Sequence, residues 1–363
     1  MVYLLGLGTA VPAGAISQAD AARHALWLYP HSEEEKRLLP IFYERTGVKE
    51  RGSVLLEGKD GLLAPFFSQT KEEEERGPTT EERMKEFTRK APGLAIEASQ
   101  KAVQDAGIEI RSIRHLVTVS CTGFSSPGFD LELIKSLGLA RDITRTQVGF
   151  MGCHGAVNGL RTAQALALTH PGESALVSSV EISSIHYAYG WKTEKVVANS
   201  LFADGAGSAV FSTCEPKNPW RLQATGSYVF PDSEDAMSWR IGNHGFEMGL
   251  SARVPELIGA NLKGWLVPWL ARHHLKITDI PSWAVHPGGP KVLDVVKSAL
   301  NLPADALSFS RKILAEHGNM SSATILFLLE ALRKEKAGLP CLALAFGPGL
   351  TAEAALFNLK EKS

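Results

Sequence analysis

The chain of 363 residues is 44% hydrophobic and 21% charged, and its formal net charge is -1. A chain of that length and composition can bury a full core, either in one large domain or in two fused ones. Lysine and arginine are spread along the whole sequence without a basic stripe, which excludes a dedicated nucleic-acid-binding module.

The start of the chain predicts a strand and not a secretory signal, because residues 1–12 carry no positive charge and Gly6 and Gly8 interrupt the apolar run. No apolar run approaches the roughly 18 residues of a membrane span. The four cysteines form neither a disulfide framework nor a CxxC metal pair. We therefore expect a soluble protein of the reducing cytoplasm.

Strand-like and helical segments alternate along the chain, which predicts an α/β or mixed layered fold. The expected strands cover residues 2–7, 115–120, 174–180, 208–212, 222–230, 283–285, 339–345 and 352–357. Helical periodicity marks residues 91–106, 156–168, 254–273, 290–300 and 322–336. The segment 57–83, with the run KEEEER at 71–76, is interpreted as a solvated surface excursion.

The two halves of the chain are alike in outline. In the first half, strands lead to Cys153 at the start of a long helix. In the second half, a strand leads to His286, and Asn319 then opens another long helix. A pseudo-twofold arrangement of the halves would bring both helix starts and one strand end to a common buried point.

Cys153 stands in the small-residue sequence GCHG at 152–155. A helix N-terminus carries roughly half a positive charge and free N–H donors, and a nearby imidazole would add to this field. We therefore expect its thiol to ionise below the ordinary pKa of about 8.5 and to be a thiolate at neutral pH. We interpret Cys121, Cys214 and Cys341 as inert, because a free cysteine usually packs as a small apolar residue.

His286 and Asn319 are the candidate partners of this thiol. His286 precedes a Pro-Gly-Gly turn, which lets backbone and substrate approach closely. Asn319 supplies an N–H donor that does not titrate, although it can equally cap a helix. Two donors on one thioester oxygen form an oxyanion hole, each contributing about 3 kcal/mol. Other histidines, such as His170, His273 and His274, are interpreted as surface or packing residues.

Four motifs occur in order along the chain: LFADGA at 201–206, HPGGP at 286–290, GNMSSA at 318–323 and FGPGLTAE at 346–353. Together with Gly152 and Cys153 they resemble the signatures of type III polyketide synthases, the chalcone synthase group of the thiolase superfamily. The resemblance extends over nearly the whole chain and keeps the order and spacing of the motifs.

The resemblance implies a thiolase fold, five-layered αβαβα, built from two related halves at 1–215 and 216–363. It also implies a homodimer that uses free CoA thioesters and no bound cofactor. Cys153 would take the starter acyl group, while His286 and Asn319 would bind the malonyl thioester carbonyl as CO2 leaves. The resulting enolate would attack the acyl group on Cys153, so no strong base is required.

The resemblance also assigns a gate and a cavity. Phe202 matches the aromatic gate between the CoA tunnel and the cavity, and Met248 aligns with a second gate that is usually Phe. An unbranched thioether is more adaptable than a ring, so we expect a long or flexible starter. Ser183 and His186 stand where plant enzymes keep two threonines, and Trp239 lies near a position of glycine. These departures argue against a chalcone-type product.

For the CoA phosphates, the resemblance and the chemistry of basic side chains suggest Arg45, Lys49, Arg51 and Lys291. A solvated charged face is the alternative interpretation of each. The segment CTGFSSPG at 121–128 is shorter than its plant equivalent and looks like that of the bacterial branch.

Three other functions compete with that of a polyketide synthase. A ketoacyl-ACP synthase III shares the fold and the Cys, His and Asn set, but its C-terminal motif typically has glycine at the place of Pro348. A papain-like peptidase would need an aromatic-flanked cysteine context that is missing. A catalytically silent partner subunit should lack one of the three residues. We therefore expect iterative decarboxylative condensation of malonyl-CoA onto a fatty or aromatic acyl-CoA, giving a pyrone, resorcinol or phloroglucinol-type ring.

Overall fold

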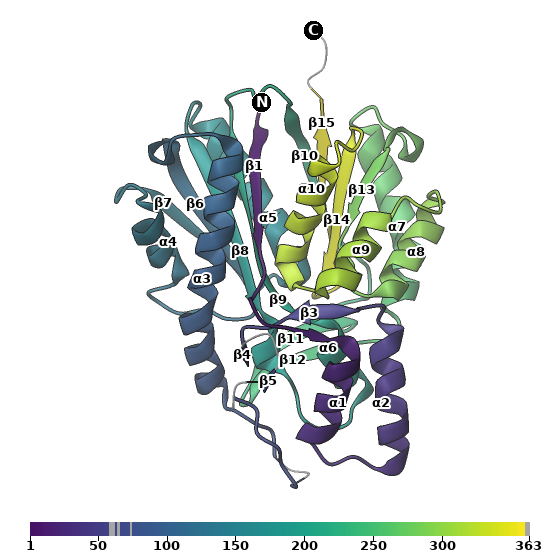
Figure 1. Ribbon diagram of the computed structural model, residues 1–363. Helices are drawn as coiled ribbons and strands as arrows, with labels where there is room; N and C mark the ends of the chain where they lie inside the picture. The colour runs from purple at the N-terminus through teal and green to yellow at the C-terminus, as the bar shows by residue number, and fades with distance from the viewer. Residues whose placement is uncertain (58–61, 64–65, 73–74, 360–363) are drawn as a thin grey trace.

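The computed structural model describes residues 1–57, 62–63, 66–72 and 75–359, and its centre is one mixed sheet of nine strands (Figure 1). These strands are β1 (Tyr3–Ala10), β6 (Ile113–Ser120), β7 (Thr144–Gly149), β8 (Ser174–Ile182), β9 (Asp204–Ser212), β10 (Trp220–Val229), β13 (Ser282–Val285), β14 (Cys341–Gly347) and β15 (Thr351–Asn358). Their order across the sheet is β13-β14-β15-β10-β1-β9-β8-β6-β7.

Three two-stranded sheets lie outside the main sheet: β2 (Ala15–Ser17) with β3 (Glu50–Gly52), β4 (Leu56–Glu57) with β5 (Leu62–Leu63), and β11 (Met237–Gly242) with β12 (Gly245–Leu250). The helices are α1 (Gln18–Leu28), α2 (Glu33–Arg45), α3 (Thr80–Ala106), α4 (Phe129–Leu137), α5 (Gly155–Thr169), α6 (Thr193–Leu201), α7 (Val254–Ala271), α8 (Pro290–Leu300), α9 (Ser308–His317) and α10 (Thr324–Lys334).

The sheet has two similar halves. In the first, β6 pairs parallel with β8, and β8 pairs antiparallel with β9; in the second, β13 pairs parallel with β14, and β14 pairs antiparallel with β15. The halves meet where β1 pairs with β10 through only two residue pairs, Tyr3 with Arg221 and Leu4 with Trp220. The expected boundary at 215 falls in the loop between β9 and β10.

Helices and sheet halves are stacked in five layers. Helices α5 and α10 pack between the two halves, α3 covers the outer face of the first, and α7 and α8 cover the outer face of the second. The central strands are buried on both faces, whereas the edge strand β7 is mostly exposed. On β6, Leu116 belongs to the cluster under α3, and Val117 to the cluster around α5 and α10. The predicted α/β class and five-layered thiolase architecture are confirmed.

One expected helix begins well before its predicted start. Helix α3 starts at Thr80 and not at 91, because the hydroxyl of Thr79 caps it in a reciprocal bond with Glu82. The helix continues through Pro92. Residues 80–83, which were predicted as the end of the surface excursion, therefore form the first turn of α3.

The prediction of a solvated excursion at 57–83 is wrong for Phe67 and Arg83, which are 4% and 0% exposed. The guanidinium of Arg83 lies over the ring of Phe67, 5.2 Å from its centroid, and donates to backbone carbonyls, including that of Tyr187 at 2.9 Å. Satisfied donors make such burial possible. Residues 58–61, 64–65 and 73–74 of the excursion lie outside the described residues.

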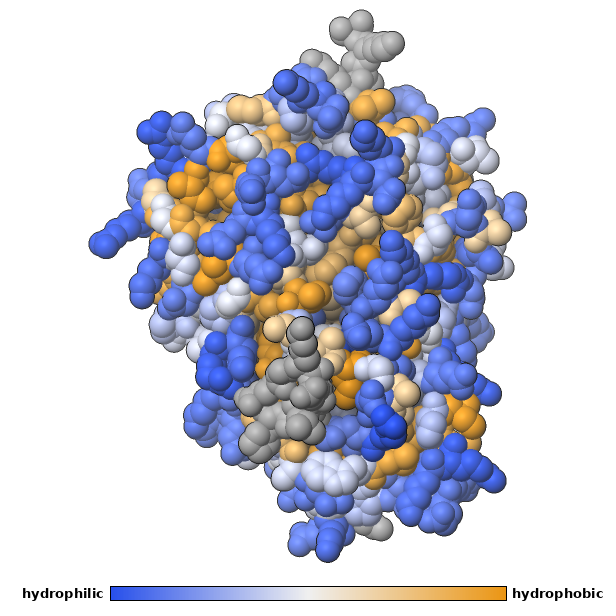
Figure 2. Space-filling model, in the orientation of Figure 1, coloured by the Kyte–Doolittle hydropathy of each residue, from blue (hydrophilic) through white to orange (hydrophobic). Residues whose placement is uncertain are grey.

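The surface seen in Figure 2 is mainly hydrophilic, and apolar residues are interrupted by charged ones over this face. Among the described residues, the helices are each too short or too polar to cross a bilayer.

Candidate active site

Cys153 lies in a short 3-10 turn, Gly152–His154, directly before α5. Gly152 has a φ of 71°, in the left-handed region that favours glycine. A Cβ atom there would come within 2.3 Å of Cδ of Pro348. The turn that presents the thiol therefore needs glycine for its backbone conformation and for its close contact with the FGPGLTAE motif. The predicted position of Cys153 at a helix start is confirmed.

Asn319 occupies the equivalent place in the second half, between α9 and the turn that leads into α10. Its backbone N–H and C=O bond to the residues on either side of Phe202, at 2.8 and 2.9 Å. Its Oδ1 accepts a hydrogen bond from the N–H of Ser321 at 2.8 Å. Its side chain also hydrogen-bonds the thiol of Cys153, which lowers the pKa of that thiol. Asn319 thus connects the expected gate to the expected nucleophile.

His286 follows β13 directly, and its backbone N–H donates to the carbonyl of Leu344 on β14 at 2.8 Å. Its ring is 1% exposed, and neither Nδ1 nor Nε2 has a hydrogen-bond partner among the described residues. The ring interacts electrostatically with His154, the neighbour of Cys153. A buried imidazole with two open nitrogens is able to receive one proton and to donate another.

Burial determines the protonation of both groups. Burial raises the pKa of the Cys153 thiol to about 12, and the carboxylate of Glu181 acts in the same direction, while a hydrogen bond from Ser321 opposes it. Burial also lowers the pKa of His286 to about 3. At neutral pH the structure therefore has a protonated thiol at Cys153 and a neutral imidazole at His286. The prediction of a thiolate is wrong for this state, because it relied on a cationic ring that burial does not allow.

A second thiol belongs to the site, against the prediction that Cys121 is an inert packing residue. The Sγ of Cys121 lies 3.0 Å from the hydroxyl of Ser321, and that hydroxyl also donates to the Sγ of Cys153 at 3.7 Å. Burial raises the pKa of Cys121 above its ordinary value. Sequence spacing gives no signal of this contact, because residues 121 and 321 belong to different halves of the fold.

A buried carboxylate lies behind the two thiols. Glu181 is 0% exposed and accepts hydrogen bonds from the backbone N–H of Cys121 at 3.0 Å and from the hydroxyl of Thr122 at 2.7 Å. It also accepts a bond from the hydroxyl of Ser322. Burial raises the pKa of Glu181, and these donors oppose that shift. The carboxylate fixes the loop after β6 to the turn that begins α10, a role that no motif indicated.

A cavity of about 530 Å³ opens at the nucleophile. Its lining includes Cys153 and all the predicted gate and cavity residues, namely Phe202, Met248, Ser183, His186 and Trp239. His286 and Asn319 are not part of this described lining. The hydroxyl of Ser183 is buried without a partner among the described residues, so it is free to bind a substrate oxygen.

His186 is a fixed wall of the cavity. Its Nδ1 accepts a hydrogen bond from the N–H of Phe246 at 3.0 Å, and its Nε2 donates to the carbonyl of Thr122 at 2.6 Å. Burial lowers the pKa of His186 to about 3. Trp239 stands edge-on to this ring at 5.4 Å. Because both nitrogens are engaged, His186 shapes the cavity and cannot transfer protons to a substrate.

Arg51 is the one predicted CoA residue in the described lining of the cavity. It is 9% exposed, and its Nη1 donates to the carbonyls of Phe202 at 3.0 Å and Asn199 at 2.5 Å. This arrangement fixes the gate loop, so Arg51 has fewer free donors for a phosphate.

The other candidate CoA residues, Arg45, Lys49 and Lys291, are exposed and lie outside that lining. Lys192 and Lys195, near the start of α6, do line the cavity and were not singled out from the sequence. The CoA-binding roles of all these residues stay predictions.

Comparisons with known proteins agree with the motifs. The family model for the N-terminal domain of chalcone and stilbene synthases matches residues 1–216, and that for the C-terminal domain matches residues 221–359. The chain belongs to the chalcone and stilbene synthase family. It is therefore a type III polyketide synthase, an enzyme of the CoA-thioester condensing acyltransferase type, and the ketoacyl-ACP synthase III alternative is not favoured.

Bacterial relatives are similar over most of their length. The chain is 31% identical over 363 residues to the alpha-pyrone synthesis polyketide synthase-like Pks18 of Mycobacterium tuberculosis, covering 98% of this chain and 90% of that protein. It is 37% identical over 272 residues to the 1,3,6,8-tetrahydroxynaphthalene synthase of Streptomyces peucetius subsp. caesius, covering 73% and 72%. The crystal structure of PKS-I from the brown alga Ectocarpus siliculosus superposes with a TM-score of 0.90 at 28% identity, over 98% of both chains.

Proposed function

We propose that this type III polyketide synthase condenses malonyl-CoA iteratively onto an acyl-CoA starter, with a fatty acyl group favoured over an aromatic one, and cyclises the product. The observation that carries the proposal is the thiol of Cys153 in the wall of a cavity of about 530 Å³, within the usual size of a small-molecule site. The product class is a pyrone, resorcinol or phloroglucinol-type ring.

In the loading step, the sulfur of Cys153 attacks the thioester carbonyl of the starter, and its proton passes to His286. The CoA thiolate leaves and takes a proton from the imidazolium, so the imidazole returns to its neutral form. The raised pKa of Cys153 and the lowered pKa of His286 both favour the neutral pair before and after this step. Attack and proton transfer are therefore concerted.

In the extension step, Nε2–H of His286 and Nδ2–H of Asn319 donate to the malonyl thioester oxygen. Loss of CO2 leaves an enolate, whose negative oxygen these two donors stabilise. Its carbon attacks the acyl carbonyl on Cys153, the C–S bond breaks, and the freed sulfur accepts the lengthened chain for another round. No carboxylate base is needed, because decarboxylation supplies the electron pair.

The apolar lining supports a fatty starter. From Cys153 the lining continues to side chains of the N-terminal segments, including Ile16, Leu28, Leu55, Leu56 and Phe67. These side chains form an apolar wall, so an alkyl chain placed against it would remove its own surface from water.

The direct test incubates the purified protein with malonyl-CoA and a series of acyl-CoA starters of increasing length, with mass spectrometry of the products. We expect CO2 release and extended, cyclised products from the wild type and from Cys214→Ala, an exposed cysteine control. Cys153→Ala should form none. Full activity in Cys153→Ala, or no product with any starter, would overturn the proposal. An obligatory acyl-carrier protein would restore the ketoacyl-ACP synthase III hypothesis.

We also propose a cytoplasmic homodimer without a bound cofactor. Four free cysteines, three of them buried, fit a reducing compartment. Sedimentation equilibrium of the purified chain tests the dimer, and a monomer at micromolar concentration with full condensing activity would exclude it as a requirement.

A further inference from the structure

A second group of reactive side chains lies at the far end of the strands that reach the cavity. His115 is in β6, His170 directly follows α5, and Glu173 directly precedes β8. One donor atom from each residue lies within 4.8 Å of the others. Cys121 and Ser183, which follow the opposite ends of β6 and β8, line the cavity. We call this group the His115 cluster. It is separated from the candidate active site by the length of strands β6 and β8.

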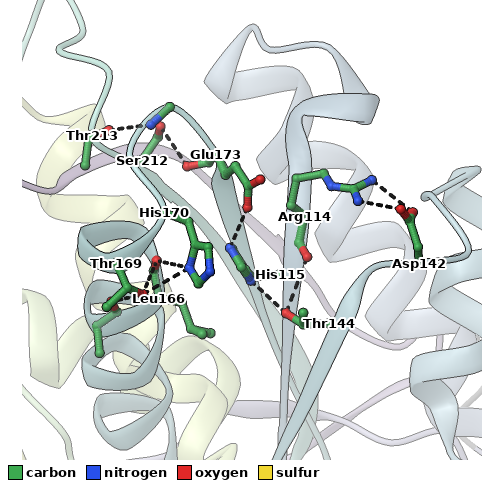
Figure 3. Close-up of polar contacts among 12 residues, drawn as sticks. Arg114, His115, Asp142, Thr144, Leu166, Thr169, His170, Glu173, Ser212 and Thr213 are labelled. Atoms are coloured by element: carbon green, nitrogen blue, oxygen red, sulfur yellow. Dashed lines mark hydrogen bonds and ion pairs between the residues drawn. The ribbon is translucent and has the colours of Figure 1, made fainter.

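Hydrogen bonds orient the ring of His115 (Figure 3). Its Nδ1 lies 2.7 Å from the hydroxyl of Thr144, and that hydroxyl donates to the carbonyl of Arg114 at 3.4 Å. With an ion on Nε2, this hydroxyl oxygen would accept from Nδ1–H and leave the Nε2 lone pair to the ion. His115 is 2% exposed, and a carboxylate oxygen of Glu173 lies 2.9 Å from Nε2. Because that oxygen only accepts, Nε2 shares a proton with Glu173 in the metal-free protein, and a bound ion would displace this proton.

His170 has the same orientation device. Its Nδ1 lies 3.1 Å from the carbonyl of Leu166 and 3.0 Å from the hydroxyl of Thr169, which itself donates to backbone carbonyls. A carbonyl only accepts, so Nδ1 carries the proton and the lone pair again lies on Nε2. The rings of His115 and His170 lie side by side, with centroids 4.7 Å apart.

One nitrogen of each imidazole and a carboxylate thus converge, and the proton shared by His115 and Glu173 stands where an ion would bind. Histidine ligands of metals characteristically donate their second N–H to a carbonyl or other acceptor, which fixes the tautomer. Two atoms that are each about 2.1 Å from one tetrahedral ion lie about 3.4 Å apart. Nε2 of His115 and the Glu173 oxygen, now 2.9 Å apart, would therefore separate by about 0.5 Å on binding. The donor atom of His170 lies within 4.8 Å of the other two, so it would move inward by up to about 1.4 Å to reach the same spacing.

We propose that the His115 cluster binds a divalent ion of the zinc type, with Nε2 of both histidines and the carboxylate of Glu173 as ligands and water at the fourth position. Two imidazoles and one carboxylate suit zinc better than calcium or magnesium, which take oxygen ligands. The ion links β6, the end of α5 and the start of β8. Its role is to stabilise this end of the sheet, because the cavity lies at the other end.

The backbone of Gly172 and Glu173 is held in place by hydrogen bonds. The N–H of Gly172 donates to the hydroxyl of Thr213 at 2.9 Å, and the hydroxyl of Ser212 donates to the carbonyl of Glu173 at 3.1 Å (Figure 3). The backbone that carries the carboxylate is therefore anchored to the end of β9, so little ordering is needed on binding.

Calorimetric titration of the full chain with Zn²⁺ tests the proposal. Because zinc also binds thiols, the titrated protein carries Cys121→Ala and Cys153→Ala, which removes the thiols of the cavity. We expect one site per chain and an increase in melting temperature of about 4 °C at a hundredfold excess of free zinc over the dissociation constant. In the same background, His170→Ala and Glu173→Gln should each weaken binding at least tenfold.

His274→Asn is the matched control. His274 is exposed, lies outside the cluster and has a φ of 58°, a conformation that asparagine tolerates. It should leave zinc affinity unchanged. The proposal would be overturned if the protein with Cys121→Ala and Cys153→Ala bound no zinc. It would also be overturned if His170→Ala and Glu173→Gln bound zinc as tightly as that protein does. Co²⁺ is the second probe, and a thiolate charge-transfer band in place of an imidazole-type spectrum would overturn it as well.

Discussion

The thiol of Cys153 illustrates how burial competes with specific contacts at a single residue. Hydrogen bonds from Ser321 and Asn319 lower its pKa, and the N-terminus of α5 favours negative charge there. Desolvation is the larger effect and raises the pKa to about 12. Burial also keeps His286 neutral, so both groups are uncharged at neutral pH in the absence of substrate.

This balance predicts the pH dependence of alkylation in the absence of substrate. The pKa of Cys153 is about 12. At any pH below that value, raising the pH by one unit increases the thiolate fraction tenfold. The rate of inactivation by iodoacetamide should therefore increase about tenfold per unit from pH 7 to pH 9 without a plateau. Peptide mapping assigns the modified thiol, with Cys121→Ala as the control for labelling of the neighbour. A plateau below pH 7 that His286→Gln removes would show a thiolate and imidazolium pair.

At this scale the sequence was informative where a side chain stands beside distinctive neighbours. Cys153 lies in the sequence GCHG, and His286 is followed by Pro-Gly-Gly. These neighbours were the basis for predicting where the two residues lie in the fold. Cys121, Glu181 and Ser321 were missed or misread, because their shared contacts cross between halves of the chain and no local pattern encodes them. Of these, Ser321 alone stood inside a motif that was already recognised.

Among the elements, the turn before α5 places the strictest demand on the sequence. Its glycine at 152 combines a φ of 71° with a missing side chain against Pro348. Gly138, at the end of α4, has a φ of 69°, but a Cβ atom there would meet no other segment of the chain within 4 Å. A comparison of alanine substitutions at the two glycines therefore distinguishes the effect of backbone strain from that of the steric conflict with Pro348.

Gly152→Ala should lose acylation of Cys153, whereas Gly138→Ala should retain it. Both changes introduce left-handed strain of about 1–2 kcal/mol. The melting temperature should fall by a few degrees in Gly138→Ala and further in Gly152→Ala, whose Cβ also meets Pro348. Only Gly152→Ala also pushes the thiol turn away from Pro348. Mass spectrometry of the protein after brief exposure to an acyl-CoA measures the acyl-enzyme. Equal acylation of the two variants would show that the contact with Pro348 is unimportant.

The hairpin β11–β12 carries the adaptable gate residue, and a change there should alter starter choice. Met248→Phe places a rigid ring in the cavity lining, so we expect the ratio of kcat/KM for long-chain over short starters to fall about tenfold. Ile241→Phe, on the exposed side of the same hairpin, is the control. Competition between two starters in one reaction gives the ratio directly. An unchanged ratio would remove Met248 from the gate.

The sequence predicted elements well where burial is continuous and poorly where polar residues dominate. The main strands, α7 and α8 were found because their apolar residues repeat over several turns or pleats. Helices α1 and α2 were missed, since α2 begins with Glu33 and neighbouring charged residues that read as surface loop. The true start of α3 was also missed, although the pair Thr79 and Glu82 was a usable capping signal.

For the whole molecule, the layered fold encloses titratable groups that water would otherwise ionise. Both His186 and His286 are buried between sheet and covering segments, and burial lowers each pKa to about 3 from 6.5. In the unfolded chain the same rings take up protons below pH 6.5. Between pH 3 and 6.5 the unfolded state therefore binds more protons than the folded state.

The free energy of unfolding should consequently have its full value above pH 6.5 and decrease as the pH is lowered from 6.5 to 3. Each of the two histidines contributes about 1.4 kcal/mol per pH unit to the slope. Because His286 has no hydrogen-bond partner among the described residues, His286→Gln removes its titration without breaking a bond, and the slope between pH 6 and 4.5 should decrease by about that amount. Urea unfolding at several pH values measures the slopes, with His274→Asn as an exposed control. If wild type and His286→Gln lose stability in parallel, the imidazole is hydrated in the folded enzyme, and the neutral thiol and imidazole pair that begins the proposed loading step does not exist.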